Sequence, residues 1–215
     1  MTRDLFAPAL AGLAIEQGLV SAGDEARLIA LLGELELAPF RFQGWTGNRL
    51  TRSFGWHYDF DDRSFSETDP LPAWLNPLRE LAGQLAGDPA ARFSHALITR
   101  YDPGAGIGWH RDRPIFDKIV GFSLVSPATL RFRRRTATGF DRRSILLEPR
   151  SAYLLSGEVR EAWEHSIAPA AELRYSITLR SVREARLRSA GPANATSRAT
   201  NGGTAAPRRG SKADN

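Results

Sequence analysis

Short runs of strand-forming residues, separated by glycine and proline turns, fill the chain after Asp88, and this pattern restricts the fold more than any other feature. Each run has the length of a β-strand and is too short for a typical helix. The runs cover residues 92–101, 107–112, 118–125, 129–134, 144–148, 152–156, 163–167 and 173–181. Eight short strands with tight turns favour a double-sheet jelly roll, which is also called a double-stranded β-helix.

Two amphipathic helices are expected ahead of these strands. Apolar residues recur at helical spacing after Ser21, with acidic residues in the first turn, and again over residues 72–86. Between them, residues 40–60 are rich in aromatic side chains and broken by glycines, which indicates short strands or a hairpin. We therefore expect an α+β fold that is mainly β, a jelly roll with N-terminal helices packed outside it.

Composition changes along the chain and suggests three parts: an N-terminal helical segment at 1–38, one domain at 39–190 and a basic tail at 191–215. The tail holds almost no large apolar residues, so it is expected to be disordered. Residues 181–215 hold seven basic and two acidic residues, whereas residues 1–180 hold 22 of each. The formal charge of +5 therefore belongs to the C-terminal end, and the body is neutral overall.

Two absences limit the function. The chain has no cysteine, which excludes disulfides, a thiolate nucleophile and an iron–sulfur cluster, so a metal would have to be held by His, Asp or Glu. The N-terminal stretch contains Asp4 and Glu16 and no apolar run of spanning length. We therefore expect neither a signal peptide nor a membrane anchor, and a monomeric cytoplasmic protein.

The segment YDPGAGIGWHRD contains the first candidate metal ligands. His110 and Asp112 are two residues apart at the end of an extended run, so their side chains leave the same face of the strand. His165 follows in the segment AWEHSI. Two imidazoles and one carboxylate on one side of a metal leave the opposite side open, as in non-heme Fe(II) enzymes that activate dioxygen.

A second H-x-D pair, His57 and Asp59, shows that this short motif is weak on its own. Either pair could take His165 as a third ligand. The pair at 57 and 59 precedes the second helix and lies outside the expected jelly roll, whereas the other pair lies early in the strand series. We therefore predict that His110, Asp112 and His165 bind the metal and that His57 and Asp59 do not.

The last expected strand, LRYSITLRS at 173–181, places polar residues on one face and apolar residues on the other. The polar face holds Arg174, Ser176, Thr178 and Arg180. An ordinary half-exposed strand would show the same alternation. A dicarboxylic co-substrate chelated to a metal would, however, need a cation beyond the metal, and a bidentate arginine suits that carboxylate best.

Together these residues resemble the AlkB-like family of 2-oxoglutarate oxygenases. The resemblance covers roughly residues 39–183 and is strongest over 99–113 and 153–180. In that family an N-x-Y strand end precedes H-x-D, a distant histidine completes the set, and R-x-N-x-T-x-R closes the barrel. The matching segments here are Thr99-Arg100-Tyr101, His110-Arg111-Asp112, His165 and Arg174-Tyr175-Ser176-Ile177-Thr178-Leu179-Arg180.

The resemblance implies an Fe(II)- and 2-oxoglutarate-dependent dioxygenase that consumes O2, with Asp112 serving catalysis as a metal ligand. It also implies that Tyr101 and Arg174 bind the C5 carboxylate of 2-oxoglutarate. Arg180 would then lie near the metal-chelating end of the same molecule.

The sequence departs from the family at two positions. Thr99 and Ser176 stand where the family has asparagine. Both side chains are shorter but keep the capacity to form hydrogen bonds. They therefore remain, together with Thr178, candidate contacts of the co-substrate.

Substrate selection in the family lies largely in the segment before the barrel, which reads NRLTRSFGWHYDF here. By resemblance, Trp56 and Tyr58 would stack on or line a base, with His57 near the cleft. Trp56 could equally cover the barrel without touching a base. Interleaved arginines suit a single-stranded or flipped nucleotide, and this region offers Arg41, Arg49, Arg52 and Arg63.

The resemblance implies oxidative dealkylation of N-alkylated bases in DNA or RNA, so nucleic acid is the expected partner. Hydroxylation of a modified wobble uridine in tRNA is the second interpretation, because residues 103–107 and 157–160 resemble that branch. Oxidation of a protein or a small molecule by the same iron centre stays open. A cupin-like binding barrel would also form a jelly roll, but it would have no reason to direct Arg174 at a metal.

Overall fold

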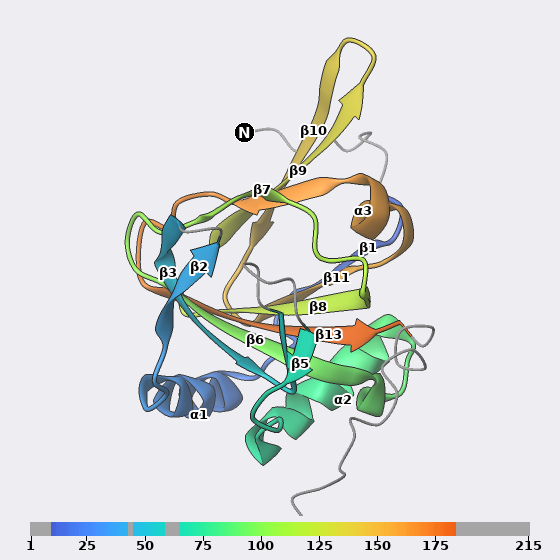
Figure 1. The fold of residues 1–215 in the computed structure, drawn as a ribbon. Helices are drawn as coiled ribbons and strands as arrows, with labels where there is room; N and C mark the ends of the chain where they lie inside the picture. The colour runs from blue at the N-terminus through green and yellow to red at the C-terminus, as the bar shows by residue number, and fades with distance from the viewer. Residues whose placement is uncertain (1–9, 43–44, 59–64, 184–215) are drawn as a thin grey trace, which may run out of the picture.

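β-Strands dominate the computed structural model, which describes residues 10–42, 45–58 and 65–183 (Figure 1). The strands that follow α2 are β6 (Phe93–Tyr101), β7 (Ile107–His110), β8 (Phe116–Leu124), β9 (Ala128–Thr136), β10 (Gly139–Leu147), β11 (Ser151–Leu155), β12 (Glu164–Ile167) and β13 (Arg174–Val182). Each overlaps one of the eight runs expected from the sequence. The predicted series of short strands is therefore confirmed.

These strands form two antiparallel sheets that lie as two layers in Figure 1. The larger sheet has the order β1-β11-β8-β13-β6-β3-β2, and the smaller has the order β10-β9-β12-β7. The additional strands are β1 (Leu13–Glu16), β2 (Ala38–Phe42) and β3 (Trp45–Phe54), with β4 (Trp56–Tyr58) and β5 (Phe65–Glu67) paired in a ribbon of their own. The chain passes repeatedly between the two sheets, which is the predicted double-stranded β-helix.

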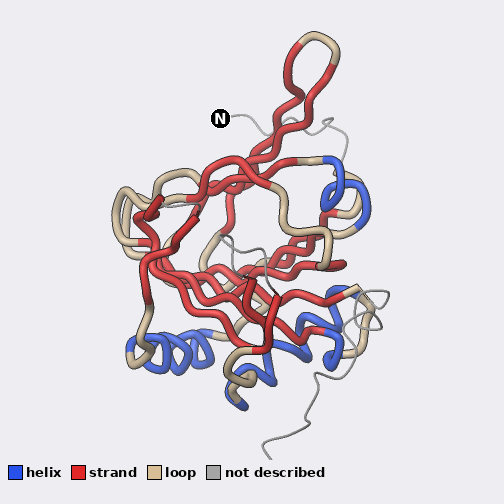
Figure 2. Tube along the Cα trace, in the orientation of Figure 1, coloured by secondary structure: helices blue, strands red, loops and turns tan. Residues whose placement is uncertain are grey.

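Helices cover the outer face of the larger sheet, below it in Figure 2. These helices are α1 (Ala22–Gly33) and α2 (Asn76–Ala86), and the 3-10 helix η1 (Ala73–Leu75) leads directly into α2. Two shorter helices lie later in the chain: η2 (Ala90–Arg92) precedes β6, and α3 (Gly157–Ala162) precedes β12. Ser21 caps α1, because its hydroxyl accepts a hydrogen bond from the backbone amide of Asp24. The two main helices lie where the sequence predicts them and pack outside the barrel.

The segment 1–38 contains a strand as well as a helix. β1 pairs with β11 through Leu13 and Leu155 and forms an edge of the larger sheet. Four residues are too few for a clear period-two pattern, so the sequence offers no signal for this strand. The expected tail at 191–215 lies outside the described residues. Within those residues, no helix is long and apolar enough to cross a membrane.

Two apolar cores lie on the two sides of the larger sheet. One fills the space between the sheet and the helices and includes Leu32, Phe122 and Ile177. The other fills the space between the sheets and includes Phe132. β13 is buried along its whole length, so its polar face lies inside the protein and not in water. An ordinary half-exposed strand at this place is therefore excluded.

Gly121 on β8 leaves room for the ring of Tyr153. A methyl group added at Gly121 would lie 2.3 Å from Cζ of Tyr153, closer than such atoms can approach. Tyr153 is buried, so its ring cannot turn aside without disturbing the packing around it. We expect Gly121→Ala to lower the free energy of unfolding by about 1–3 kcal/mol, as measured by chemical denaturation.

Gly33, at the end of α1, is the matched control for that substitution. A methyl group there would meet nothing within 4 Å. Gly33→Ala should therefore leave the free energy of unfolding unchanged or raise it by up to about 1 kcal/mol, because alanine has the higher helix propensity. Equal stabilities of the two alanine variants would contradict the steric explanation.

Candidate metal centre

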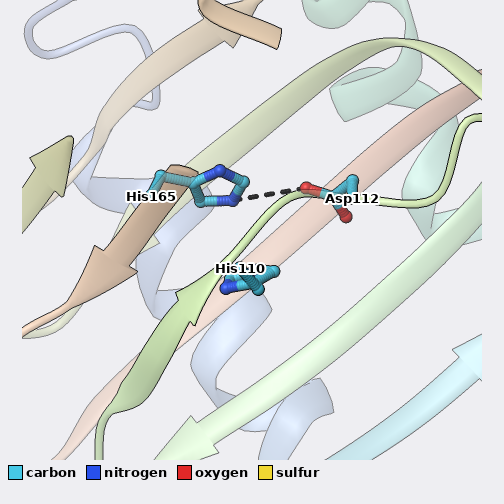
Figure 3. Close-up of side chains that lie close together, drawn as sticks. All are labelled: His110, Asp112 and His165. Atoms are coloured by element: carbon cyan, nitrogen blue, oxygen red, sulfur yellow. Dashed lines mark ion pairs between the residues drawn. The ribbon is translucent and has the colours of Figure 1, made fainter. Parts of the chain in front are cut away.

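The three predicted ligands converge between the two sheets. One ligand atom each from His110, Asp112 and His165 lie within 4.8 Å of one another. Nε2 of His165 is 3.3 Å from Oδ2 of Asp112, and the two imidazole centres are 4.3 Å apart. Figure 3 shows the three side chains gathered around one point. In the described part of the chain, no other group of His, Asp and Glu residues meets the same geometric test.

β7 and β12 bring the two histidines together although they are distant in the sequence. His110 and His165 are directly opposite each other in this antiparallel pair, so their side chains leave the same face of the sheet. β7 ends at His110, and Asp112 lies two residues farther, before β8. The smaller sheet therefore carries the two histidines on its inner face, and the segment after β7 brings Asp112 beside them.

Asp112 is held by Arg180, which comes from β13 in the larger sheet. Nη2 and Nε of Arg180 donate hydrogen bonds to Oδ1 of Asp112 at 2.8 and 3.0 Å. Burial by itself would raise the pKa of Asp112, but Arg180 and then His165 bring that pKa well below its usual value. Asp112 is therefore ionised at neutral pH, and its other oxygen faces the imidazole of His165.

His110 is held in one tautomer by the backbone. Its Nδ1 lies 2.9 Å from the carbonyl oxygen of Gly108. A carbonyl only accepts hydrogen bonds, so Nδ1 carries the proton and Nε2 keeps a lone pair. Burial first, and then the charge of His165, lowers the pKa of His110 to about 4. The ring is therefore neutral at neutral pH, which is the form that binds a metal.

A pocket extends from these ligands to Arg174 on β13. Arg174 is 1% exposed, and its Nε donates a hydrogen bond to Oγ of Ser123 at 3.2 Å. Its guanidinium carbon lies 4.8 Å from the centre of the Tyr101 ring. Its Nη1 is buried and has no hydrogen-bond partner among the described residues. A buried N–H without a partner is costly, so this group is suited to binding an anion.

The other predicted co-substrate contacts line the same pocket. They are Thr99, Tyr101, Ser176 and Thr178, with Arg180 at the end near the histidines. β6 and β13 pair so that Ser176 is opposite Thr99 and Arg174 is opposite Tyr101. The structure thus brings together the side chains that the family resemblance assigns to 2-oxoglutarate.

The candidate substrate residues are placed only in part. Trp56, His57 and Tyr58 form β4, but their side chains lie outside the described residues, and so does Asp59. The contact of Trp56 with a base therefore stays a prediction. So does the exclusion of the second H-x-D pair from the metal.

Two further buried side chains belong to the surroundings of the site, and the sequence gives little signal for either. Tyr153 lines the pocket, and its pKa is raised to about 12, chiefly by burial, so its hydroxyl stays protonated. His95 lies behind Arg180, with 3.4 Å between Nδ1 of the imidazole and Nη1 of the guanidinium. β11 is buried on both faces, so alternation cannot show which of its residues face the pocket.

Comparison with known proteins gives one family and one fold. The model of the 2OG-Fe(II) oxygenase superfamily matches residues 38–188. The solved structure of OsALKBH1 superposes with a TM-score of 0.61 at 14% sequence identity, covering 79% of this chain and 96% of that one. At 14% identity, this structural similarity shows that the two proteins share a fold.

Two curated relatives are similar in sequence. The mouse tRNA (carboxymethyluridine(34)-5-O)-methyltransferase ALKBH8 is 26% identical over 168 residues, which are 74% of this chain and 24% of that protein. The Arabidopsis thaliana alkylated DNA repair protein ALKBH8 homolog is 23% identical over 210 residues, with coverages of 80% and 58%. The chain thus spans about a quarter of the mouse protein and somewhat more than half of the plant protein.

Proposed function

This chain belongs to the 2OG-Fe(II) oxygenase superfamily and is an Fe(II)- and 2-oxoglutarate-dependent dioxygenase, and from that premise we propose that it oxidises an N-alkyl group on a nucleic-acid base. His110, Asp112 and His165 hold the iron, and Arg174 with Tyr101 holds the distal carboxylate of 2-oxoglutarate. Bound iron, 2-oxoglutarate and O2 supply the oxidation of a substrate C–H bond, with succinate and carbon dioxide as co-products.

The single observation that supports this reaction best is that one buried pocket holds two complementary features. One end offers two imidazoles and an ionised carboxylate, the donor set of an oxygen-activating iron. The other end offers Arg174, whose buried Nη1 has no partner among the described residues. A dicarboxylate that chelates the iron with one end would satisfy that N–H with the other.

The chain's own residues position the reactants and keep charges fixed. Arg180 keeps Asp112 ionised and directs its free oxygen toward the histidines. The carbonyl of Gly108 fixes the proton of His110 on Nδ1. Apolar side chains such as Ile119 complete the pocket wall and limit the access of water. Oxidation of an N-methyl carbon would leave an unstable hemiaminal that releases formaldehyde.

A basic surface supports a nucleic-acid substrate. His110 and His165 face inward, so alternate residues of the smaller sheet face outward. We call this outer surface the arginine face, and it comprises Arg131, Arg133, Arg135, Arg142, Trp109 and Phe140. Residues 128–147 hold six arginines and one aspartate, although residues 1–180 are neutral as a whole.

Arginines and aromatic rings alternate across the arginine face. The guanidinium carbon of Arg133 lies 4.6 Å from the centre of the Trp109 ring and 4.8 Å from that of Phe140. Those of Arg142 and Arg135 lie 5.2 and 5.9 Å from the centre of Phe140. Arginine interleaved with aromatic rings suits the phosphates and bases of a single strand, which favours nucleic acid over a neutral small molecule.

Hydroxylation of a modified wobble uridine in tRNA is the second candidate function. The mouse relative is named as a tRNA carboxymethyluridine methyltransferase, which favours this candidate. The name of the plant relative, an alkylated DNA repair protein, favours dealkylation. Oxidation of a protein or small molecule by the same site is the remaining alternative.

A substrate screen tests these candidates. Succinate formation would be followed with oligonucleotides that carry 1-methyladenine or 3-methylcytosine, with tRNA that carries modified wobble uridines, and without added substrate. We expect the methylated oligonucleotides to raise succinate formation above the substrate-free rate and to release formaldehyde. Stimulation by tRNA alone would favour the second candidate, and stimulation by neither nucleic acid would refute a nucleic-acid substrate.

The arginine face gives a separate prediction about binding. Replacing Arg135 and Arg142 together by Gln should weaken binding of an unmodified single-stranded oligonucleotide at low salt. The plot of the logarithm of the association constant against the logarithm of the salt concentration has a negative slope. This slope should become less negative by about two units, one for each lost phosphate contact. Fluorescence anisotropy across a salt series measures both quantities.

Arg27 provides the control for this experiment. It is an exposed arginine on α1, on the far side of the larger sheet from the β9–β10 hairpin in Figure 1. Arg27→Gln should leave the salt slope unchanged. Equal effects of the double variant and Arg27→Gln would mean that the arginine face makes no particular contact with nucleic acid.

A further inference from the structure

Arg49 on β3 is a buried cation beside the proposed iron site, and no acidic partner for it lies among the described residues. It is 9% exposed, and its Nε is buried without a hydrogen-bond partner. Its guanidinium carbon lies 3.8 Å from the centre of the Phe40 ring. Among the residues that the structure describes, it forms no ion pair. Such a group is costly to bury, so its place needs an explanation.

The register of β3 directs Arg49 toward the pocket. Thr51 is opposite Thr99, which lines the pocket, and residues opposite each other in antiparallel strands share a face. Arg49 lies two residues before Thr51 and leaves β3 on the same face. Its electrostatic neighbours agree with this direction, because burial and then the charge of Arg180 lower the pKa of Arg49.

Arg52, three residues along the same strand, has the opposite arrangement. Its Nη2 forms an ion pair with Asp69 at 2.8 Å, and its side chain is 33% exposed. Its guanidinium carbon lies 5.2 Å from the centre of the Phe54 ring, which belongs to the core beneath the helices. Arg52 is thus a paired surface arginine, whereas Arg49 is a buried one that faces the site.

The charges of the loaded site leave Arg49 without a counterion. Iron(II) carries two positive charges and 2-oxoglutarate two negative ones, so together they add no net charge. Arg180 is paired with Asp112, and Arg174 faces the distal carboxylate of the co-substrate. With Asp112 as the acidic partner of Arg180, the described wall of the loaded site keeps two positive charges in excess, those of Arg174 and Arg49. Of these two, Arg174 faces the distal carboxylate, so the charge of Arg49 is left for an anion that arrives with the substrate.

We propose that Arg49 binds a phosphate of the nucleotide whose alkyl group is oxidised and so fixes that nucleotide beside the iron. This inference rests on the proposed nucleic-acid substrate. A guanidinium matches a phosphate with two parallel hydrogen bonds, and burial strengthens such a contact. Every nucleotide carries the phosphate, so the contact positions the substrate without reading its base.

The test measures binding without turnover. The protein would be loaded with Mn(II) and N-oxalylglycine, an unreactive analogue of 2-oxoglutarate, and titrated with AMP and with adenosine by calorimetry. Wild-type protein should bind AMP on the order of ten- to a hundredfold more tightly than adenosine, the range of a hydrogen bond to a charged group. Arg49→Gln should reduce this preference to a few-fold, and Arg52→Gln should keep it.

The possible results separate this inference from the proposed function. A wild-type protein without preference for AMP, or an Arg49→Gln protein that keeps the preference, would overturn the role of Arg49. Arg49 could instead bind the carboxylate of a modified base. The wild-type protein would then prefer 5-carboxymethyluridine to uridine, Arg49→Gln would lose this preference, and neither protein would prefer AMP to adenosine. That result would overturn the phosphate assignment. Phosphate binding that depends on Arg49 in a protein that oxidises no nucleic acid would support the binding site and refute the proposed function.

Two further variants keep the test independent of folding. Arg49→Met replaces an unpaired buried charge by an apolar side chain, so its melting temperature should equal or exceed that of the wild type while the preference for AMP is lost. Arg49→Lys keeps a point charge and should retain part of that preference. A large fall in the melting temperature of Arg49→Met would show instead that Arg49 is a structural residue.

Discussion

Replacing Asp112 by Asn is expected to lower the affinity for Fe(II) by more than about a hundredfold. Loss of a residue that only hydrogen-bonds to a metal ligand costs about ten- to a hundredfold, and loss of a ligand itself should cost more. Succinate formation should disappear with it. The substitution removes the charged ligand but keeps the shape and an acceptor oxygen for Arg180, which lies 2.8 Å from Asp112. Anaerobic equilibrium dialysis with Fe(II) measures the affinity, and melting of the metal-free protein reports whether the fold is kept.

Asp59→Asn is the matched control, because Asp59 belongs to the second H-x-D pair. It should keep the iron affinity of the wild type. His165→Ala should behave like Asp112→Asn, since His165 lies in the same cluster. Loss of iron in Asp59→Asn together with retention in Asp112→Asn would show that the wrong pair has been assigned.

Replacing Arg174 by Met should weaken 2-oxoglutarate binding by roughly thirtyfold to several thousandfold, the cost of removing one partner of a buried charge pair. Iron affinity should be largely kept, because the described contacts of Arg174 are with Ser123 and Tyr101 and not with the metal ligands. Calorimetric titration of the Mn(II)-loaded protein with 2-oxoglutarate measures the effect.

Two further variants are expected to weaken 2-oxoglutarate binding by smaller amounts. Arg174→Lys should recover part of the affinity, because it restores the charge but not the two parallel N–H groups. Ser123→Ala removes only the hydroxyl that orients Arg174 and should cost a few-fold, the value of a typical hydrogen bond. Unchanged affinity for 2-oxoglutarate in Arg174→Met would refute the assignment of the anchor.

The strand series and the spacing of the metal ligands are readable from the sequence because they depend on local patterns. Short runs between turn residues predict the strands of the barrel, and an H-x-D pair at a strand end predicts two side chains on one face. The distant partner, His165, is a candidate by its residue type, and the resemblance to a family supports this choice. The structure places that residue directly opposite His110, and one ligand atom of each lies within 4.8 Å of one from Asp112.

Other features depend on contacts between distant segments, which local patterns do not contain. β1 joins the larger sheet through β11, although its four residues show no distinct pattern. The pocket position of Tyr153 depends on a strand that is buried on both faces. In such a strand, period-two alternation carries no information about which side faces the site.

Arg49 and Arg52 show most directly what cannot be predicted from the sequence. Both lie among the interleaved arginines of one segment, and alternation places them on opposite faces of β3 without saying which face is inside. Only the pairing of β3 with β6 decides it, because Thr51 then lies opposite Thr99 in the wall of the pocket. One arginine meets Asp69 at the surface, and the other is buried without a carboxylate among the described residues.

The sequence by itself therefore determined the strand series of the barrel and offered candidates for the three ligands and for the anchor of a dicarboxylate, because strand patterns and residue types can be read along the chain. The tertiary structure alone decided that the polar face of β13 is buried, that Arg180 is paired with Asp112, and that Arg49 meets no acidic side chain among the described residues. Burial and charge pairing are properties of surroundings, and the surroundings exist only once the two sheets have closed on each other.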